Sequence, residues 1–384
     1  MKVIIWTAHF LPHVGGVENF SARLWPKIVE AGHSVKLITC NTDRASFRED
    51  FQGVSVVRLS SFNLLSGRYP IPLLWKHRSC FERCDFDVAV TNTRFFLTSF
   101  LGARIAKRCR RPLIHVEHGS GWRVTGSFVV NAIVKLVDKT LGRWILKNAD
   151  VVCCVSSDSA CYCKQLVPRE VVILPNGIET KLFECRDVSL RNDLGISPYA
   201  TVILFAGRLV KEKGIVEYLQ VANLLRRNNT HFIIAGTGPL TDLVKDAAQK
   251  NDKLHYLGPV PHHEMPRLYS AADIVCHPSY YLEGLPTVIL EAGAAGCCVI
   301  AARTTGISDL IPSDEYGLIV DPRNVVQLQT ALTTLIDNPN RRQAVADRLR
   351  KRIREEFDIT LVAKRMEALL TSALTRRRES TASG

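Results

Sequence analysis

Two positively charged residues follow a short apolar run in the second half of the chain. The run TVILFAG (201–207) has the composition of a buried strand, and Arg208 and Lys213 come after it, just before a helical pattern. The free amides and the dipole of a helix N-terminus favour an anion. Arginine adds a planar fork of donors and lysine a point charge, so the pair could neutralise much of a diphosphate. The pattern predicts a phosphate site, with an exposed charged loop as the alternative.

Two glutamates flank the start of another predicted helix. Glu283 stands before this helix, Pro286 fits its first turn, and Glu291 falls in its second turn. Backbone amides near Gly284 and Leu285 could hold a polar sugar or a phosphate. The carboxylate of Glu291 could accept two hydrogen bonds from a ribose diol. Its neighbours are small or apolar, which argues against an ordinary surface position for Glu291.

The first half of the chain offers two weaker candidates. Gly15 and Gly16 lie directly before the first helical pattern, where glycine lets the backbone approach a ligand closely. His118 follows a predicted strand at 112–117; a lone histidine is more often structural, but the end of a strand is a favourable place for chemistry. Neither a complete GxGxxG dinucleotide pattern nor a GxxxxGK[ST] P-loop occurs. A nicotinamide cofactor is therefore not expected.

Short apolar runs alternate with helical patterns along the whole chain, which is typical of βαβ units and parallel sheets. The predicted strands of the first half are 2–7, 34–40, 54–59, 87–91, 112–117 and 150–156. Those of the second half are 201–209, 231–236, 253–258, 273–279, 297–302 and 316–322. The first helix is expected at 17–31. We predict an α/β fold of two doubly wound, Rossmann-like domains that face each other across a cleft, with ligands at the carboxyl ends of the strands.

The domain boundaries follow from turn and polar stretches. The turn at 175–177 and the polar stretch behind it separate a domain at 1–178 from a domain at 179–358. A last helical pattern occupies 359–375. The remaining residues, 376–384, begin with three arginines and end in Ser, Thr, Ala and Gly, and they are predicted to be disordered.

Composition excludes several classes of protein. The 384 residues are 46% hydrophobic and 23% charged, which is globular and neither disordered nor collagen-like. The 12 cysteines lie mostly in apolar runs, without CxxC pairs or zinc-site spacing, so we predict unpaired core thiols, no metal and a cytoplasmic location. The apolar stretch 284–302 could span a bilayer by length, but Glu291 near its middle favours a buried helix followed by a strand.

Positive charge is concentrated in the first half. Residues 1–180 hold 24 Lys+Arg and 14 Asp+Glu, a net of +10, which leaves +3 of the total +13 for the rest. An apolar loop at 63–76 and a basic run suggest contact with an anionic membrane surface. The run consists of Arg104, Lys107, Arg108, Arg110 and Arg111. A solvated basic surface is the alternative; nucleic acid is not expected, because no binding motif is present.

The helical pattern at 129–147 combines positive charge with an apolar face. It places basic residues at every fourth position: Lys135, Lys139, Arg143 and Lys147. Its other face is predicted to pack in the core and consists of Ile133, Leu136, Val137, Leu141 and Ile145.

Taken together, the motifs resemble one family. They are GGVE (15–18), HG (118–119), PNGI (175–178), GRLVKEKG (207–214), GTGP (236–239), LG (257–258) and the pair Glu283 and Glu291. Their order and spacing over nearly the whole chain are similar to those of the retaining GT-B glycosyltransferases of the family 4-like group, which includes bacterial mannosyl- and glucosyltransferases. One stretch departs from the pattern: relatives commonly show Gly-Gly-x-x-Glu where this chain has 304–309, ending in Asp309.

The resemblance implies a division of labour between the domains. The domain at 1–178 would take the acceptor, the domain at 179–358 would bind a nucleoside-diphosphate sugar, and the helix at 359–375 would cross back to the first domain. The implied site residues are Arg208 and Lys213 for the diphosphate, Glu291 for the ribose, Glu283 for the transferred sugar, Gly15 and Gly16 near the phosphates, Gly284 and Leu285 through their backbone, and His118 at the reaction centre. Members of this family usually need no metal, and no cofactor is expected.

The resemblance also implies a reaction. A hexose would move with retention from the donor to a saccharide acceptor carried on a lipid, in cell-surface glycan synthesis at the inner face of the membrane. Two alternatives remain open from the residues: a nucleotide-sugar epimerase or hydrolase on the same fold, and a nucleotide-binding subunit without activity.

Overall fold

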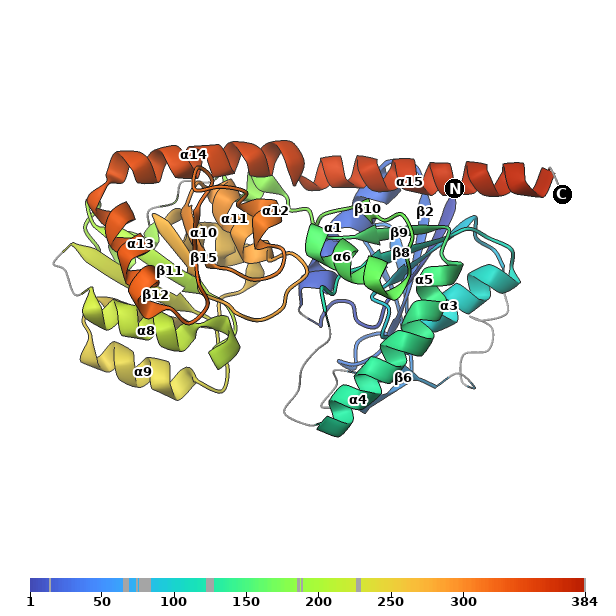
Figure 1. The fold of residues 1–384 in the computed structure, drawn as a ribbon, viewed down its shortest axis with the longest axis horizontal. Coiled ribbons are helices and arrows are strands. Elements are labelled where there is room, and N and C mark those ends of the chain that lie inside the picture. The colour runs from blue at the N-terminus through green and yellow to red at the C-terminus, as the bar shows by residue number, and fades with distance from the viewer. Residues whose placement is uncertain are drawn as a thin grey trace. The chain divides into compact units, whose positions relative to one another are not determined.

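The computed structural model describes residues 1–13, 15–64, 69–73, 75, 84–121, 128–184, 187, 189–225 and 229–382. The chain forms two compact units, each built of strands and helices in alternation (Figure 1). The first unit consists of Met1–Gly177 together with the C-terminal segment from Ile359, and the second consists of Ile178–Asp358. The predicted α/β fold with two Rossmann-like domains is confirmed.

The first unit is built on a parallel sheet. In the described part of the chain its strand order is β10-β9-β8-β7-β1-β2-β4-β3, and every neighbouring pair is parallel except β3 with β4. The strands are β1 (Lys2–Trp6), β2 (Ser34–Cys40), β3 (Arg48–Phe51), β4 (Val54–Leu59), β7 (Val88–Asn92), β8 (Leu113–Glu117), β9 (Val151–Cys154) and β10 (Val172–Ile173). Strands β1, β7, β8 and β9 are buried almost throughout because helices cover both faces.

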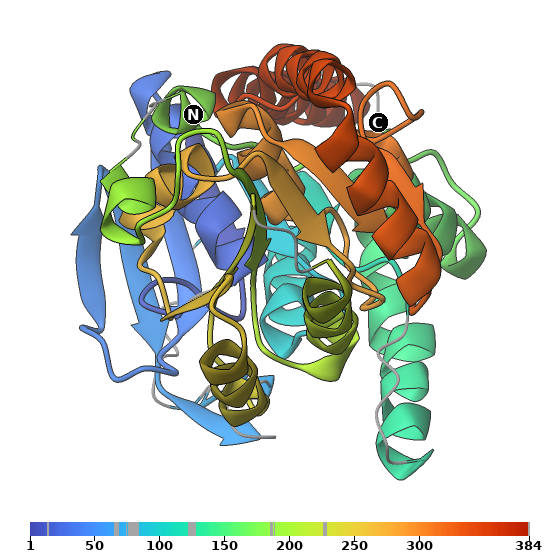
Figure 2. The same cartoon turned by 90° about the vertical axis from the view of Figure 1, so that its left-hand side faces the viewer.

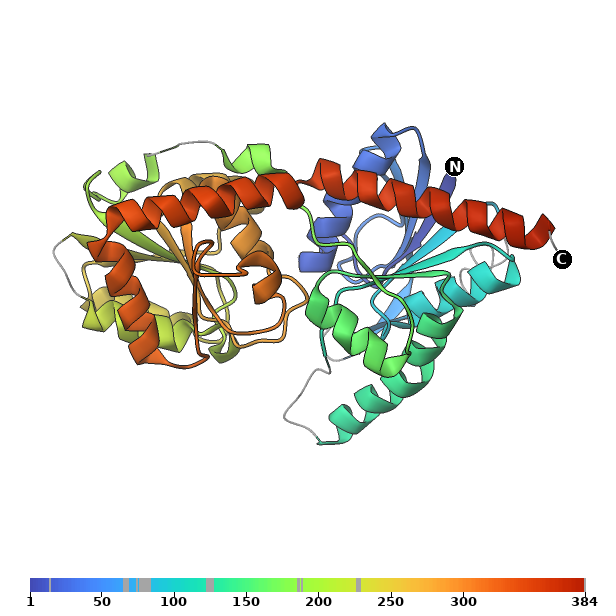
Figure 3. The same ribbon diagram turned by 45° about the horizontal axis from the view of Figure 1, so that its top comes forward.

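Helices and one hairpin complete the first unit. The helices are α1 (Gly16–Glu30), α3 (Leu97–Arg108), α4 (Phe128–Val137), α5 (Arg143–Asn148), α6 (Ser157–Leu166) and α15 (Ile359–Ala382), and the hairpin joins β5 (Ser61–Leu64) to β6 (Tyr69–Pro72). A π-helical segment, Asp138–Gly142, links α4 to α5. Helix α15 packs against α1, β7 and β8 (Figure 3).

The second unit repeats this plan. Its strands lie in the order β13-β12-β11-β14-β15-β16, all parallel. They are β11 (Thr201–Ala206), β12 (Thr230–Ala235), β13 (Leu254–Gly258), β14 (Ile274–His277), β15 (Cys298–Ala302) and β16 (Leu318–Val320). Helices flank this sheet, as Figure 2 shows. They are α7 (Ser189–Asp193), α8 (Ile215–Leu224), α9 (Thr241–Lys250), α10 (Met265–Ser270), α11 (Thr287–Ala295), α12 (Ile307–Leu310), α13 (Val325–Asp337) and α14 (Pro339–Glu356).

The apolar stretch at 284–302 is α11 followed by β15, as predicted from its central glutamate. Both elements are almost wholly buried. Among the described residues, no helix combines the length and the hydrophobicity needed to cross a bilayer.

Three predictions about local structure are wrong. Helix α15 continues to Ala382, past the predicted end at 375, so residues 376–382 are helical and not disordered. Ile133 and Leu136 of α4 are 55% and 62% exposed, so this part of the apolar face does not pack in the core. Cys84 and Cys109 form a disulfide between the segment before β7 and the end of α3, so these two thiols are not unpaired.

Candidate functional site

The strand order of the second sheet reverses between β11 and β14. The loops that leave two such strands diverge, one to each face of the sheet, and ligands of open α/β sheets bind in the crevice outside their carboxyl ends. The loop after β11 carries Arg208 and Lys213, and the loop after β14 carries Glu283. The topology therefore brings three of the predicted site residues to one edge of the sheet.

Lys213 and Glu283 form an ion pair there. Their side chains are only 16% and 19% exposed, so water screens the pair weakly. The same Glu283 oxygen, Oε1, accepts a hydrogen bond from the Ser279 hydroxyl at 3.3 Å, and His277 Nε2 lies 3.5 Å from it. Burial alone would raise the pKa of Glu283, but the Lys213 cation and His277 outweigh burial and hold this pKa far below its usual value. The carboxylate stays ionised.

The backbone fastens the two loops to each other. Gly214 has φ +76°, and a Cβ atom at this position would lie 2.3 Å from the carbonyl oxygen of Pro278. The backbone N–H of Tyr280 donates a hydrogen bond of 2.9 Å to the carbonyl oxygen of Glu212. A side chain at 214 would force the loops apart, so glycine is needed for Lys213 to reach Glu283.

The loop after β15 closes on the segment before α11. The Thr305 hydroxyl donates a hydrogen bond of 2.6 Å to the carbonyl oxygen of Glu283. Gly306 has φ +77°, and a Cβ atom there would lie 2.4 Å from the carbonyl oxygen of Gly284. Leu285 is buried. The stretch 304–309 departs from the family pattern. It thus supports the backbone of residues 283–285, which are predicted to contact the donor.

Glu291 lies inside the second unit. It is buried in α11, and its Oε2 accepts a hydrogen bond of 3.2 Å from the Tyr269 hydroxyl, while His262 Nε2 lies 3.3 Å from Oε1. A carboxylate offers about four acceptor positions, so these contacts do not exhaust its capacity. Arg208, by contrast, is exposed at the end of β11.

In the first unit the strand order reverses between β1 and β7. Gly15 caps the N-terminus of α1, which follows β1, and Gly16 is the first residue of that helix. The Glu18 carboxylate lies over Gly15, whereas the space beside Gly16 is open. His118 comes directly after β8.

His118 is a buried, neutral histidine. Its ring meets Phe20 edge-on, with 5.6 Å between ring centroids. Burial lowers the pKa of His118 to about 4, although the neighbouring Glu117 carboxylate and a hydrogen bond with Asn176 act in the opposite direction. Its Nε2 has no hydrogen-bond partner among the described residues. At neutral pH the imidazole is uncharged and can donate or accept one hydrogen bond there.

Sequence reasoning missed several polar residues at these strand ends. His277, the last residue of β14, faces Glu283. Arg94 and Glu117, at the ends of β7 and β8, form a buried ion pair with a distance of 2.9 Å. The signal of His277 and Glu117 in the sequence is an ionisable residue at the end of an otherwise apolar strand, whereas Arg94 lies two residues beyond β7. Within the described residues, no group of three or more His, Cys, Asp or Glu side chains could hold a metal ion.

Two family profiles match the chain. The profile "Glycosyltransferase Family 4" matches residues 14–182, and the profile "Glycosyl transferases group 1" matches residues 189–352. An uncharacterized glycosyltransferase of Methanocaldococcus jannaschii is 26% identical over 377 residues, which cover 93% of this chain and 95% of that protein. The alpha-monoglucosyldiacylglycerol synthase of Streptococcus pneumoniae is 26% identical over 339 residues, which cover 83% of this chain and 75% of that enzyme.

A solved structure shares the fold. HepE from Anabaena, in complex with UDP, superposes with a TM-score of 0.76 over 97% of this chain and 100% of that chain, at 20% identity. Together, the two profiles extend from the first sheet to the last helices of the second unit. The chain therefore belongs to the GT-B glycosyltransferases of the family 4-like group.

Proposed function

We propose that the protein transfers a hexose, with retention of anomeric configuration and without a metal ion, from a nucleoside-diphosphate sugar to a saccharide acceptor carried on a lipid. Such a reaction would serve cell-surface glycan synthesis at the inner face of the membrane. The observation that carries the proposal is the weakly exposed Lys213–Glu283 pair at the switch point of the second sheet. In this proposal Lys213 is the cation for the diphosphate, and the neighbouring Glu283 is the carboxylate for the sugar hydroxyls.

The proposed roles follow the chemistry of each group. Lys213 and the exposed Arg208 would bind the diphosphate and stabilise the negative charge that grows on it as the glycosidic bond breaks. Glu283 would accept hydrogen bonds from the transferred sugar, and Glu291 from the ribose hydroxyls. His118 would contact the sugar at the reaction centre through its neutral imidazole. The amides of Gly284 and Leu285, and the segment at Gly15 and Gly16, complete the proposed donor contacts.

The reaction itself is a substitution at the anomeric carbon. The acceptor oxygen bonds to this carbon from the face that the diphosphate leaves, and the bond from the carbon to the diphosphate oxygen breaks. The acceptor proton moves to the departing phosphate oxygen. Because Arg208 and Lys213 would supply the positive charge, we expect turnover to persist in EDTA.

The donor can be identified without an acceptor. HepE has been solved with UDP and with UDP-glucose, which supports a uridine nucleotide as the first probe. We suggest a thermal-shift panel of UDP-glucose, UDP-N-acetylglucosamine, GDP-mannose and ADP-glucose with the matching nucleoside diphosphates. A ligand at 100 times its dissociation constant stabilises the fold by ~2.7 kcal/mol, which such a panel detects easily. If none of them stabilised the protein, the proposed donor site would be wrong.

A transfer assay separates the proposal from its rivals. With the selected donor and a lipid-linked acceptor, the labelled sugar should appear on the acceptor. Free sugar in place of product would indicate a hydrolase, and an altered nucleotide sugar would indicate an epimerase. Nuclear magnetic resonance of the first product would read the anomeric configuration, and inversion would contradict the retaining mechanism.

The proposed contact with an anionic membrane is supported by one surface of the first unit. Helix α4 exposes Ile133 and Leu136, and the basic residues of the continuous helical stretch from α4 to α5 are also exposed. These are Lys135, Lys139, Arg143 and Lys147. An amphipathic helix of this kind binds the interface through its apolar side chains and attracts anionic headgroups. The name of the Streptococcus pneumoniae relative, which specifies a glucosyldiacylglycerol, supports a lipid acceptor.

Vesicle sedimentation tests this surface. We expect binding to vesicles of phosphatidylcholine mixed with phosphatidylglycerol, weaker binding at high salt, and loss of binding when Ile133 and Leu136 are both replaced by Ser. The matched control is Val326→Ser, because Val326 is an apolar residue on α13 of the second unit that is even more exposed than Ile133 and Leu136. Equal binding to pure phosphatidylcholine would remove the electrostatic argument.

A further inference from the structure

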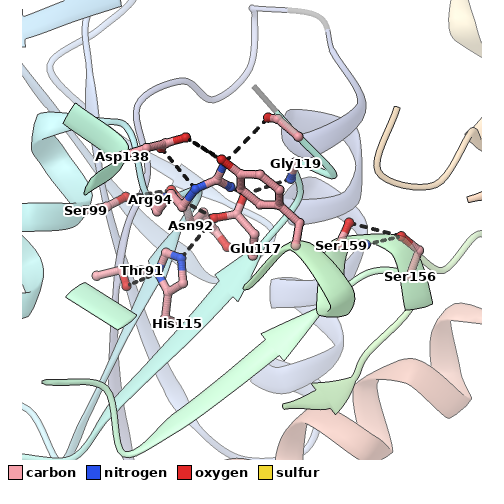
Figure 4. Close-up of polar contacts among 12 residues, drawn as sticks. Thr91, Asn92, Arg94, Ser99, His115, Glu117, Gly119, Asp138, Ser156 and Ser159 are labelled. Atoms are coloured by element: carbon pink, nitrogen blue, oxygen red, sulfur yellow. Dashed lines mark hydrogen bonds and ion pairs between the residues drawn. The ribbon is translucent and has the colours of Figure 1, made fainter. Parts of the chain in front are cut away.

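A cluster of charged side chains lies buried beside the His118–Gly119 turn of the first unit (Figure 4). Its members are Arg94 after β7, Glu117 at the end of β8, and Asp138 at the start of the π-helical segment. The three side chains are at most 1% exposed. Burying charges costs several kcal/mol per ion in a protein, so this arrangement is expensive unless it is fully paired.

The pairing is extensive. Arg94 Nη1 lies 2.9 Å from Glu117 Oε1 in an ion pair, and Arg94 Nη2 donates a hydrogen bond of 3.1 Å to Asp138 Oδ2. The Tyr162 hydroxyl donates a hydrogen bond of 2.9 Å to Asp138 Oδ2, and its ring lies 4.5 Å from Arg94 Cζ. The guanidinium group is therefore fixed by two carboxylates and an aromatic face. The cluster joins β7, β8, the π-helical segment and α6.

Glu117 also holds the backbone on both sides of the cluster. The N–H of Gly119 donates a hydrogen bond of 2.7 Å to Glu117 Oε1, and the N–H of Arg94 donates one of 3.1 Å to Oε2. His118 lies between Glu117 and Gly119 in the chain. The two hydrogen bonds thus set the direction in which the backbone leaves β8, and with it the placement of the imidazole.

The neighbouring loop is strained. Thr93 has φ +63°, a conformation that costs a β-branched residue of order 1–3 kcal/mol and persists only where the surroundings enforce it. Its N–H donates a hydrogen bond of 2.9 Å to Val116 of β8, and the next N–H is the one that Glu117 accepts. Both loops are therefore held in place by β8 and its last side chain.

A purely structural core would not need these charges. Buried ion clusters can often be replaced by apolar side chains of similar volume without loss of stability. Here the carboxylate of Glu117 does something that an apolar side chain cannot, because it accepts the amide of the residue after His118. That contact points to a role in geometry.

We propose that Arg94, Glu117 and Asp138 are positioning residues that hold the His118–Gly119 turn in the geometry required for sugar transfer. This inference rests on the role proposed above for His118. None of the three needs to touch a ligand, because Glu117 acts through the turn and Arg94 and Asp138 act through Glu117.

Glu117→Gln is the central test, with the donor selected by the thermal-shift panel. We expect kcat to fall by about 100-fold, as misplacement by about 1 Å can do, while KM for the donor stays within about threefold. In the His118→Asn variant, Glu117→Gln should lower kcat further by less than about twofold, since both substitutions act through the same imidazole. If the double variant lost kcat by the product of the two separate factors, the proposal would be overturned.

A matched control separates positioning from stability. Asp273→Asn removes the carboxylate that pairs with Arg191 at 2.8 Å before β14 in the second unit, away from the carboxyl ends of the strands. This variant should lose stability without losing kcat. If Glu117→Gln fails to fold, Arg94→Lys keeps the charge but cannot contact both carboxylates, and it should lower kcat with the same dependence on His118. Unchanged kcat in Arg94→Lys would then overturn the proposal.

Hydrogen exchange gives a readout that is independent of activity. Glutamine keeps only one of the two acceptor oxygens of Glu117. In Glu117→Gln the amide of Gly119 or that of Arg94 should therefore exchange about tenfold faster, which corresponds to one lost hydrogen bond, and Asp273→Asn should leave both unchanged. If amide exchange were unchanged in Glu117→Gln while His118→Asn lost turnover, the positioning role alone would be refuted. Full turnover in His118→Asn, with faster exchange in Glu117→Gln, would instead refute the proposed function of His118 and the link to catalysis together.

Discussion

Replacing Lys213 by Met leaves the carboxylate of Glu283 without its cation. Both side chains are more than four-fifths buried, and breaking a fully buried pair costs about 3–5 kcal/mol, because one charge stays behind uncompensated. The remaining exposure favours the lower end, about 3 kcal/mol. For a domain of this size each kcal/mol shifts the melting temperature by about 2–4 °C, so Lys213→Met should melt about 6–12 °C lower. If Lys213 binds the diphosphate, turnover should fall as well, by about 100-fold or more.

Two spectroscopic signals locate the effect. All five tryptophans precede residue 150 and therefore belong to the first unit, so tryptophan fluorescence reports that unit while circular dichroism reports both. Since Lys213 lies in the second unit, we expect the lower melting temperature in the circular-dichroism transition and not in the fluorescence transition. The double variant with Lys213→Met and Glu283→Gln should recover most of the stability, because no buried charge remains, but none of the turnover. A Lys213→Met protein with the wild-type melting temperature and turnover would refute the reasoning.

Three shorter predictions concern neighbouring residues. Arg208→Ala should lower kcat by about 10²–10³-fold and change stability by less than about 0.5 kcal/mol, since the side chain is exposed; Lys211→Ala in the same loop is the control. Gly214→Ala should destabilise by more than about 1 kcal/mol in urea unfolding, because its φ is +76° and a Cβ atom would strike Pro278. The pKa of His118 is lowered from 6.5 to about 4, so its contribution to stability, about 3 kcal/mol, is complete above pH 6.5 and is lost as pH falls toward 4. His118→Asn should lose less stability than wild type between pH 7 and pH 5; an identical loss would contradict the burial argument.

The parallel strands were predictable because their residues are apolar on both faces. Strands such as β11 and β14 are apolar runs between turn residues, which periodicity detects readily. The missed strand β3 has the sequence REDF and is mostly exposed, so its pairing with β4 depends on the hairpin and not on burial. Hairpin β5–β6 was missed for a related reason, since Pro70 and Pro72 argue against a strand in the sequence.

The proximity of candidate site residues was predictable where ionisable side chains follow the ends of neighbouring strands. Lys213 and Glu283 each follow a recognisable strand, and the parallel order brings them together. Asp138 could not be placed in this way. It sits within a helical pattern, and its contact with Arg94, 44 residues away in the chain, depends on a π-helical segment that a 3.6-residue period does not reveal. The exposure of Ile133 was missed because an apolar stripe predicts burial without specifying a partner.

Each sheet has an ion pair at or beyond the carboxyl ends of two neighbouring strands, but the two pairs differ in their exposure to solvent. Arg94 and Glu117 join the loops after β7 and β8 and are completely sealed, whereas Lys213 and Glu283 join the loops after β11 and β14 and keep a sixth to a fifth of their surface in contact with solvent. A sealed pair cannot exchange its partner for a ligand without unfolding its surroundings, so it is suited to holding backbone in place. An accessible pair can trade one partner for an anionic group at modest cost, because the ligand restores the charge balance as it enters. The two proposals thus give the same type of contact two uses, geometry in the first unit and recognition in the second, and the exposure of the pair is the property that separates them.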